Sequence, residues 1–373
     1  MSENLTLPGQ QGSTATDRET LLEVKGLTKH FPIYGGFPIK RKVGAVQAVD
    51  GVDLTVGVAE SVGVVGESGC GKSTMGRLIT RLLEPTAGQI TYSGQDITSA
   101  TRRQLAPVRS EIQMIFQDPY SSLNPRQTVG SIIKSPMEVN GIDPKGGREK
   151  RVRELLELVG LNPEHYNRFP HEFSGGQRQR IGVARALSLN PKLIVADEPV
   201  SALDVSIQAQ VVNLLQKVQE ELGIAFVFIA HDLAIVRHFS QRVAVMYLGK
   251  VVEVGDRDSI YNRPRHPYTH ALLSAVPEVE LADEGEQRER IRLYGDVPSP
   301  IHPPSGCRFR TRCWKAQDKC ATEEPPLVQI SGNNGGHLTA CHFPEDPTAP
   351  REEPVIMDPA LRALEDIAEE PTS

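Results

Sequence analysis

Short, almost wholly apolar runs recur along the chain, and glycine or polar residues follow each of them. Runs of this kind are typical of strands that are buried on both faces of a parallel sheet. Other runs alternate apolar and polar residues, as half-buried strands do. The predicted strands are residues 21–27, 45–56, 61–65, 88–92, 111–116, 193–196, 224–230, 243–247 and 250–254, the last two as a closing hairpin. The pattern therefore predicts an α/β fold.

Apolar positions at helical spacing occupy the segments between several of these strands. Residues 75–83 predict one helix, and residues 207–222 predict another that ends at Gly223. Residues 127–189 predict a helical insert. Residues 29–42 contain three aromatic residues and a basic cluster, and they predict a loop. That loop is either an exposed hairpin tip or a place where an aromatic ring stacks on a nucleotide base.

The two ends of the 373-residue chain lack this periodicity. Residues 1–20 are polar and predict a disordered lead, whereas residues 297–306 predict a stiff, proline-rich linker. Residues 344–373 are rich in proline and acidic residues, and they predict a disordered tail with a short helix near 359–367. No run approaches the length of a membrane helix, and no signal pattern opens the chain. The net charge of −6 argues against a nucleic-acid partner.

Residues 66–74 read Gly-Glu-Ser-Gly-Cys-Gly-Lys-Ser-Thr and lie between a predicted strand and a predicted helix. The spacing G-x-x-x-x-G-K-S in this context indicates a phosphate-binding P-loop, in preference to a glycine-rich turn without a ligand. Glycines allow successive N–H groups to point at a phosphate, and the helix N-terminus adds positive potential. Lys72 is expected to reach the β- and γ-phosphates, and Ser73 to ligate Mg²⁺. Cys70 is expected to fill space within the loop.

Polar residues follow three of the predicted buried strands, where the ligands of parallel sheets gather. Gln117 follows residues 111–116, Asp197 and Glu198 follow 193–196, and His231 follows 224–230. Asp197 is expected to hold Mg²⁺, and Glu198 to orient or deprotonate an attacking water. His231 is expected to contact the γ-phosphate. Solvated carboxylates and a structural histidine are the simpler alternatives, and the accompanying P-loop favours the functional interpretation.

Ser174-Gly175-Gly176-Gln177 opens a predicted helix that runs to about residue 189. A serine at this position caps a helix, and two glycines let a phosphate approach the free N–H groups. Alone it would be an ordinary cap, but between a P-loop and an Asp-Glu pair it predicts a second phosphate clamp.

Four cysteines lie beyond the proline-rich linker, at positions 307, 313, 320 and 341. Thiolates from irregular backbone can converge on one Zn²⁺ or on a [4Fe–4S] cluster, and the spacing does not choose between them. His337 and His342 are close enough in sequence to be alternative ligands. Four unrelated thiols are the simpler alternative, although a segment with so little apolar core argues for a metal.

The ordered series of motifs resembles the nucleotide-binding subunit of ABC transporters over roughly residues 21–275. The series consists of residues 66–74, Gln117, 174–177, 197–198, 201–204 and His231. The resemblance implies that two subunits sandwich two ATP molecules with Mg²⁺, and that Ser73, Gln117 and Asp197 hold the metal. Glu198, His231 and Gln117 are the catalytic residues that it implies. Phe31 looks like the family's base-stacking aromatic, although Tyr34 or Phe37 are alternatives.

The residues that the resemblance assigns to ATP are Phe31, Gly66, Glu67, Ser68, Gly69, Cys70, Gly71, Lys72, Ser73, Thr74, Ser174, Gly175, Gly176, Gln177 and Asp204. It also implies the subdomains of the family: a RecA-like core, an antiparallel β subdomain, and a helical subdomain at about 127–189. Residues 276–343 are then a small, irregular, cysteine-rich C-terminal domain.

A narrower resemblance is to the oligopeptide and dipeptide importer branch. Residues 118–126 and 265–273 are similar to segments of that branch, and residues 35–37 with 46–52 look like its F-type ATPase. The branch implies a [4Fe–4S] cluster at the four cysteines, with Zn²⁺ as the alternative. It also implies two membrane permease subunits, a D-type ATPase partner or a second copy, and an indirect link to an extracytoplasmic solute-binding protein. The chain would then lie peripherally on the cytoplasmic face of the membrane.

Three other functions are alternatives to a peptide importer. The first is an importer of nickel, opines or glutathione, since such importers use similar ATPases. A soluble ABC ATPase that acts on nucleic acid or ribosomes is disfavoured, because a long coiled coil and a second motor are absent and the charge is acidic. A non-catalytic binding module is disfavoured because Lys72, Asp197, Glu198 and His231 are all present.

Overall fold

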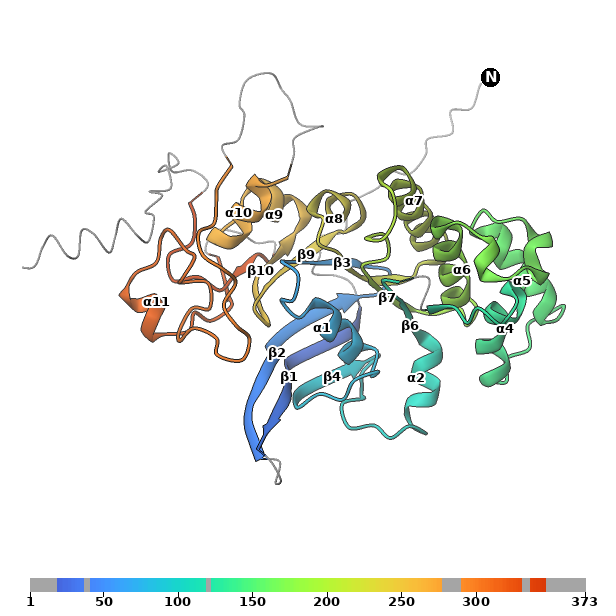
Figure 1. Cartoon of the computed structure of the whole chain (residues 1–373), viewed down its shortest axis with the longest axis horizontal. Coiled ribbons are helices and arrows are strands. Elements are labelled where there is room, and N and C mark those ends of the chain that lie inside the picture. The colour runs from blue at the N-terminus through green and yellow to red at the C-terminus, as the bar shows by residue number, and fades with distance from the viewer. Residues whose placement is uncertain (1–18, 37–40, 119–121, 277–289, 331–335, 347–373) are drawn as a thin grey trace, which may run out of the picture.

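The computed structural model describes residues 19–36, 41–118, 122–276, 290–330 and 336–346, which form two sheets with helices around them (Figure 1). The strands are β1 (Thr20–Gly35), β2 (Arg41–Gly57), β3 (Ser61–Val65), β4 (Ala87–Tyr92), β5 (Gln95–Asp96), β6 (Ile112–Ile115), β7 (Leu193–Asp197), β8 (Ala225–Ile229), β9 (Arg242–Tyr247), β10 (Lys250–Asp256), β11 (Val328–Gln329) and β12 (Leu338–Thr339). The helices are α1 (Lys72–Ile79), α2 (Leu105–Glu111), α4 (Val129–Val139), α5 (Arg148–Leu158), α6 (Gly175–Leu187), α7 (Val205–Leu222), α8 (Leu233–Phe239), α9 (Arg257–Asn262), α10 (Pro267–Ser274) and α11 (Asp318–Thr322), with 3-10 turns η1 (Pro163–Asn167) and η2 (Pro170–Glu172).

The larger sheet of the described residues has the strand order β11-β12-β10-β9-β3-β8-β7-β6. β6, β7, β8, β3 and β9 run parallel, and β9 with β10 forms the predicted antiparallel hairpin. Every residue of β3, β7 and β8 is buried, which agrees with their apolar sequences. The parallel register pairs Val64 with Ile229, and Ile229 in turn with Asp197. The ends of these strands therefore meet at one edge.

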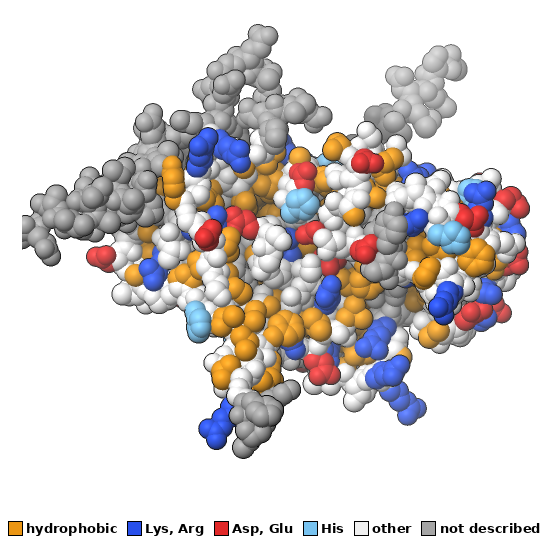
Figure 2. All heavy atoms as spheres, in the orientation of Figure 1, with side chains coloured by type: hydrophobic (Ala, Val, Ile, Leu, Met, Phe, Trp, Pro, Cys, Tyr) orange, Lys and Arg blue, Asp and Glu red, His pale blue; other side chains and the backbone are white. Residues whose placement is uncertain are grey.

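The second sheet is antiparallel, with the order β2-β1-β4-β5. The prediction of a loop over residues 29–42 was wrong for most of its length, because β1 continues to Gly35 and β2 begins at Arg41. Phe31 pairs with Val46 and Ile33 with Gly44, so the aromatic and branched residues extend the hairpin. Residues 37–40 at its tip lie outside the described residues. Figure 2 shows apolar side chains gathered over this hairpin, where Phe31 and Tyr34 are exposed.

The predicted helical insert is confirmed as α4, α5 and α6 with two 3-10 turns. These helices lie together at one end of the molecule, drawn in green in Figure 1. Val129 and Ile133 of α4, Leu155 of α5 and Ile181 of α6 belong to the same buried core. Thr128 caps α4 by accepting a hydrogen bond from the N–H of Ser131 at 3.3 Å.

The C-terminal segment, residues 290–346 as far as they are described, is largely irregular and lies at the opposite end of the molecule (Figure 1). It joins the larger sheet where β12 pairs with β10. Glu253 of β10 takes part in this pairing and is fully buried. Its side chain accepts hydrogen bonds from the backbone N–H groups of Arg265 and His266. Glu253 also lies 2.6 Å from Nε2 of His337. His337 was one of two alternative metal ligands, and it is not among the residues that line the cavity shared by the four cysteines.

None of the helices in the described residues has the length and apolar character that crossing a membrane requires.

Replacement of Gly63 by alanine is expected to destabilise the protein. A Cβ at this position of β3 would lie 2.3 Å from Cγ1 of Val236 and 2.7 Å from Oγ of Ser240. Overpacking of this kind costs about 1–3 kcal/mol. Gly182→Ala is the matched control, because a Cβ there meets nothing within 4 Å and alanine favours a helix over glycine by up to about 1 kcal/mol. Urea unfolding of the two variants should give opposite signs, and an unchanged midpoint for Gly63→Ala would contradict the packing argument.

Candidate functional site

The loop between β3 and α1 has a backbone that only glycine can form at two of its positions. Gly66 has a φ of 152° and Gly71 a φ of 107°. A Cβ on Gly66 would lie 2.2 Å from the carbonyl oxygen of Met246, and one on Gly71 would lie 2.1 Å from that of Ala48. Glycine at these positions therefore lets the loop curl tightly against the neighbouring strands. This close approach positions the loop's backbone at the N-terminus of α1, where an anion is favoured.

Lys72 is the first residue of α1, and its side chain folds back over the loop. It is only 4% exposed, and Nζ donates hydrogen bonds to the carbonyl oxygens of Gly66 at 2.7 Å and Glu67 at 3.0 Å. Both acceptors are neutral, whereas a phosphate oxygen is charged and accepts a stronger hydrogen bond from an ammonium group. The loop thus holds a positive charge where an incoming phosphate can compete for it.

Ser73 and Asp197 meet across the gap between α1 and the end of β7. Ser73 Oγ donates to Asp197 Oδ1 at 2.7 Å, and Asp197 is 1% exposed. Burial raises the pKa of Asp197, and the hydrogen bond from Ser73 offsets this only in part. A hydroxyl beside a desolvated carboxylate is an oxygen donor set that suits Mg²⁺. The described residues contain no group of three or more His, Cys, Asp or Glu side chains placed to hold a metal ion. Mg²⁺ does not need such a group, since substrate phosphates and waters complete its coordination.

Glu198, Gln117 and His231 come from three different strand ends and lie together. Gln117 Nε2 donates to Glu198 Oε2 at 2.7 Å, and His231 Nδ1 lies 3.7 Å from the same oxygen. Glu198 has a φ of 45°, a left-handed conformation that costs roughly 1–2 kcal/mol for a residue with a side chain. Its N–H donates to the carbonyl oxygen of Ile229 at 2.9 Å, which holds it there. A small pocket beside Glu198 is lined also by Ser201 and Gln208. Backbone strain of this kind is typical of functional sites.

Ser174 caps α6 as the sequence predicts. The N–H of Gln177 donates to Ser174 Oγ at 3.3 Å, and the N–H of Ser174 donates to Gln177 Oε1 at 3.0 Å. This reciprocal capping box keeps both side chains at the start of their own helix, and Ser174 is exposed. Asp204, the N-cap residue of α7, is exposed as well. One chain therefore presents both residues outward.

Two contacts to the glycine-rich loop were missed by sequence reasoning. The hydroxyl of Tyr268 accepts a hydrogen bond from the N–H of Glu67 at 2.9 Å. Arg312 binds the carboxylate of Glu67 with both terminal nitrogens, at 2.8 and 3.1 Å. Nothing in the spacing of a single sequence indicates contacts between segments so far apart.

Phe31 lies on β1 and is 36% exposed, and Lys29 Nζ lies 5.2 Å from the centre of its ring. Tyr34, the first alternative, is 61% exposed, and Phe37, the second, lies outside the described residues.

The four cysteines of the C-terminal segment line one cavity, together with Lys315 and His342. Burial, together with the neighbouring thiols, raises the pKa of Cys313 and of Cys341 to about 12. None of the four forms a disulfide. Among the described residues these cysteines are not arranged to hold a single metal ion, so the structure does not support the expected [4Fe–4S] cluster or Zn²⁺ directly. What the structure does show is that all four thiols line the same cavity.

Two family models match the chain. The model described as "ABC transporter" matches residues 49–201, which include the glycine-rich loop and Glu198. The model described as "Oligopeptide/dipeptide transporter, C-terminal region" matches residues 252–320, which include Arg312 and three of the four cysteines.

The chain is also similar to named proteins. It is 53% identical over 331 residues to the oligopeptide transport ATP-binding protein AppF of Bacillus subtilis, covering 88% of this chain and 99% of that protein. It is 50% identical over 346 residues to the probable peptide ABC transporter ATP-binding protein y4tS of Sinorhizobium fredii, covering 93% and 95%. Among solved structures, the dimeric post-hydrolysis ATP-binding cassette MJ0796 with ADP and Pi matches at 30% identity and a TM-score of 0.56, covering 64% of this chain and 99% of that one. The cbiO1 subunit from Clostridium perfringens matches at 26% identity and a TM-score of 0.57, covering 66% and 92%.

Proposed function

The chain belongs to the ATP-binding proteins of peptide ABC transporters, and from this membership we propose that it is the ATP-hydrolysing motor of a peptide importer. The observation that carries the proposal is the meeting of three strand ends at the glycine-rich loop. Two polar groups lie side by side at that edge. One consists of Ser73 and Asp197, and the other of Gln117, Glu198 and His231. One group suits a metal-bound triphosphate, and the other suits a water that attacks it.

The site residues divide the work between binding and chemistry. Lys72 exchanges its two carbonyl acceptors for the β- and γ-phosphates, and the loop N–H groups bind the remaining phosphate oxygens. Ser73, Asp197 and Gln117 would hold Mg²⁺, which supplies charge neutralisation at the phosphates when it is bound. Glu198 orients the attacking water and accepts its proton, with its side chain held by Gln117. His231 contacts the γ-phosphate.

Ser174, Gly175, Gly176, Gln177 and Asp204 are proposed to act on the ATP of a second subunit. Their support is their position, because Ser174 and Asp204 are exposed and the side chain of Ser174 accepts a hydrogen bond at the start of its own helix. The matched structure of MJ0796 is described as a dimer. The second subunit is either a D-type ATPase or another copy of this chain.

The motor is proposed to dock on two membrane permease subunits at the cytoplasmic face of the membrane, and to act only indirectly on a solute-binding protein. Support comes from the relatives, which are named as peptide and oligopeptide transport proteins. Residues 21–275 are proposed as the motor domain, and residues 276–343 as the cysteine-rich C-terminal domain.

The four cysteines are proposed to hold a [4Fe–4S] cluster, with Zn²⁺ as the alternative. The convergence of all four on one cavity supports this proposal. The raised pKa values of Cys313 and Cys341 mean that the metal-free thiols are neutral, so a bound metal would supply the positive charge that makes them thiolates.

Glu198→Gln is expected to bind ATP normally but to hydrolyse it at least about 100-fold more slowly, because the base that accepts the proton of water is lost. Steady-state phosphate release and nucleotide binding measure the two effects separately. Glu220→Gln is the matched control, since Glu220 is an exposed carboxylate on α7 and should turn over ATP at the wild-type rate. Wild-type turnover in Glu198→Gln would exclude the proposed role.

Phe31→Ala is expected to raise KM for ATP by about tenfold with kcat little changed, because stacking of a base on an aromatic ring is worth roughly 1–3 kcal/mol. Tyr34→Ala is the control on the same strand and should leave KM unchanged. If Tyr34→Ala raises KM instead, the stacking residue is Tyr34.

Anaerobically purified protein is expected to contain about four iron and four sulfide per chain and to absorb broadly near roughly 400 nm. Cys313→Ser should lose the iron, whereas Cys70→Ser, which changes the buried cysteine of the glycine-rich loop, should keep it. Stoichiometric zinc instead of iron would indicate that the cysteines form a structural zinc site. A metal-free protein would contradict both the cluster and the zinc site.

A further inference from the structure

Residues 307–313, here called the arginine segment, lie against the ATP site while carrying two of the four cysteines. Phe309 anchors the segment, since it is 1% exposed and its ring packs against Tyr247 and Tyr268, with ring centres 5.2 and 5.3 Å away. The backbone N–H of Cys307 donates to the carbonyl oxygen of Cys320 at 2.8 Å. Two arginines, Arg308 and Arg312, extend from this anchored turn toward the motor domain.

Arg312 binds the glycine-rich loop itself. Its guanidinium forms two hydrogen bonds with the carboxylate of Glu67, and its side chain is only 9% exposed. The carbonyl oxygen of Glu67 accepts a hydrogen bond from Lys72, and its N–H donates to Tyr268. The C-terminal half of the chain thus holds Glu67 at both its side chain and its backbone. Any movement of Glu67 also moves an acceptor of Lys72.

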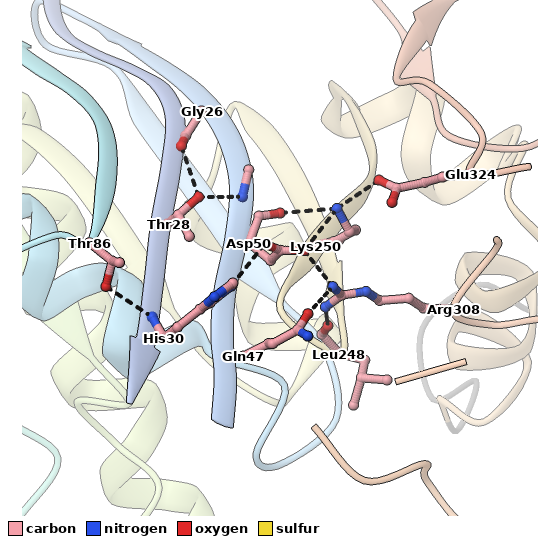
Figure 3. Close-up of polar contacts among 11 residues, drawn as sticks. Gly26, Thr28, His30, Gln47, Asp50, Thr86, Leu248, Lys250, Arg308 and Glu324 are labelled. Atoms are coloured by element: carbon pink, nitrogen blue, oxygen red, sulfur yellow. Dashed lines mark hydrogen bonds and ion pairs between the residues drawn. The ribbon is translucent and has the colours of Figure 1, made fainter. Parts of the chain in front are cut away.

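Arg308 binds the opposite side of the site, near the strand that carries Phe31. Figure 3 shows its guanidinium beside Asp50 and Gln47 of β2 and the carbonyl oxygen of Leu248.

Asp50 also contacts two other charged or titratable side chains. Its second oxygen lies 2.9 Å from Nε2 of His30, the residue before Phe31. Lys250 lies 3.2 Å from Asp50 and bridges it to Glu324 of the C-terminal segment at 2.6 Å. Burial works to raise the pKa of Asp50, but Lys250 and Arg308 outweigh it and hold the pKa below its ordinary value. Asp50 is therefore an ionised group shared by β1, β2, β10 and the arginine segment.

A carboxylate in a loop that binds a triphosphate has an electrostatic cost. Glu67 and the phosphates are both negative, and their repulsion weakens binding unless a cation offsets it. Arg312 supplies that cation in a bidentate geometry that also fixes the direction of the side chain. Without it, Glu67 would be free to turn toward the phosphates or to compete for Lys72.

We propose that Arg312 and Arg308 are positioning residues for ATP binding, and that through them the occupancy of the cysteine site sets the affinity for ATP. Arg312 directly precedes Cys313, and Arg308 directly follows Cys307. A group that holds these two cysteines therefore fixes the turn from which both arginines reach the ATP site. By linkage, ATP binding stabilises the loaded cysteine site to the same extent. The inference rests on the proposed ATPase function, and its coupling to the cysteines rests on the proposed metal at that site.

The first test measures the dissociation constant of a fluorescent ATP analogue, together with KM and kcat, for Arg312→Ala. We expect the dissociation constant and KM to rise about tenfold, the effect of losing a hydrogen-bonded charge pair, while kcat changes less than about twofold. Arg312→Lys keeps the charge but not the bidentate geometry and should be intermediate. Arg257→Ala is the control. It removes a positive charge from an exposed position on α9, where Arg257 pairs with Asp258, and it should bind ATP as the wild type does.

A double-mutant cycle separates the contact with Glu67 from a general loss of structure. In a Glu67→Gln background, Arg312→Ala should weaken ATP binding by less than about twofold, since the repulsive charge is already gone. Equal losses in both backgrounds, or an equal loss in Arg257→Ala, would overturn the positioning role. A wild-type protein that binds no ATP would instead overturn the proposed function, so the two failures are distinguishable.

The second test compares ATP-analogue binding, at the same free Mg²⁺ concentration, by wild-type protein with the proposed metal bound at the cysteines and by the same protein after that metal has been removed. Removal should raise the dissociation constant several-fold in the wild type and change it little in Arg312→Ala, since the link to Glu67 is already cut. The same ATP affinity in loaded and metal-free wild-type protein would overturn the coupling between the two sites.

Discussion

The parallel pairing of β3 with β8 and of β8 with β7 is the constraint on which the site depends. Each of these strands is buried along its whole length, so a shift of register would expose apolar residues and bury polar ones. With the register fixed, Val64 and Asp197 both lie opposite Ile229. The glycine-rich loop, the two carboxylates and His231 then follow at one edge of the sheet. The hydrophobic effect that assembles the core thereby also assembles the chemistry, because ligands bind where parallel strands end.

Two features of the site are energetically unfavourable by themselves, and the surrounding fold stabilises both. Asp197 is a carboxylate kept from water, and Glu198 has a left-handed backbone held by the bond from its N–H to Ile229. Asp197 is the last of the five buried residues of β7 and Glu198 follows it directly, so the buried strand holds both in place. A site prepared in this way does not have to reorganise its carboxylates when the phosphates arrive, and such preorganisation is a main source of catalytic power.

The C-terminal segment is connected to the site more closely than its irregular backbone suggests. Phe309 joins it to the core, β12 joins it to the sheet, and Arg308 and Arg312 join it to the two sides of the ATP site. The same turn carries Cys307 and Cys313, which share a cavity with the other two cysteines. A segment with few apolar residues of its own is thus held by charge pairs and by the group that its cysteines are proposed to bind. The arrangement gives a physical route by which the cysteine site acts on nucleotide binding.

The sequence by itself determined the α/β class, most strands, the helices α1, α4, α5, α6 and α7, and the residues of the glycine-rich loop. It also determined which polar residues end β7 and β8, because local periodicity and strand-end position carry that information. It mispredicted residues 29–35 as a loop, since single-sequence patterns did not show that Phe31 and Ile33 pair with β2. Tertiary structure alone decided that Glu67 faces Arg312, 245 residues away, and that His337 binds Glu253, 84 residues away. Contacts of this kind depend on how distant segments pack, and no spacing rule along one chain encodes them.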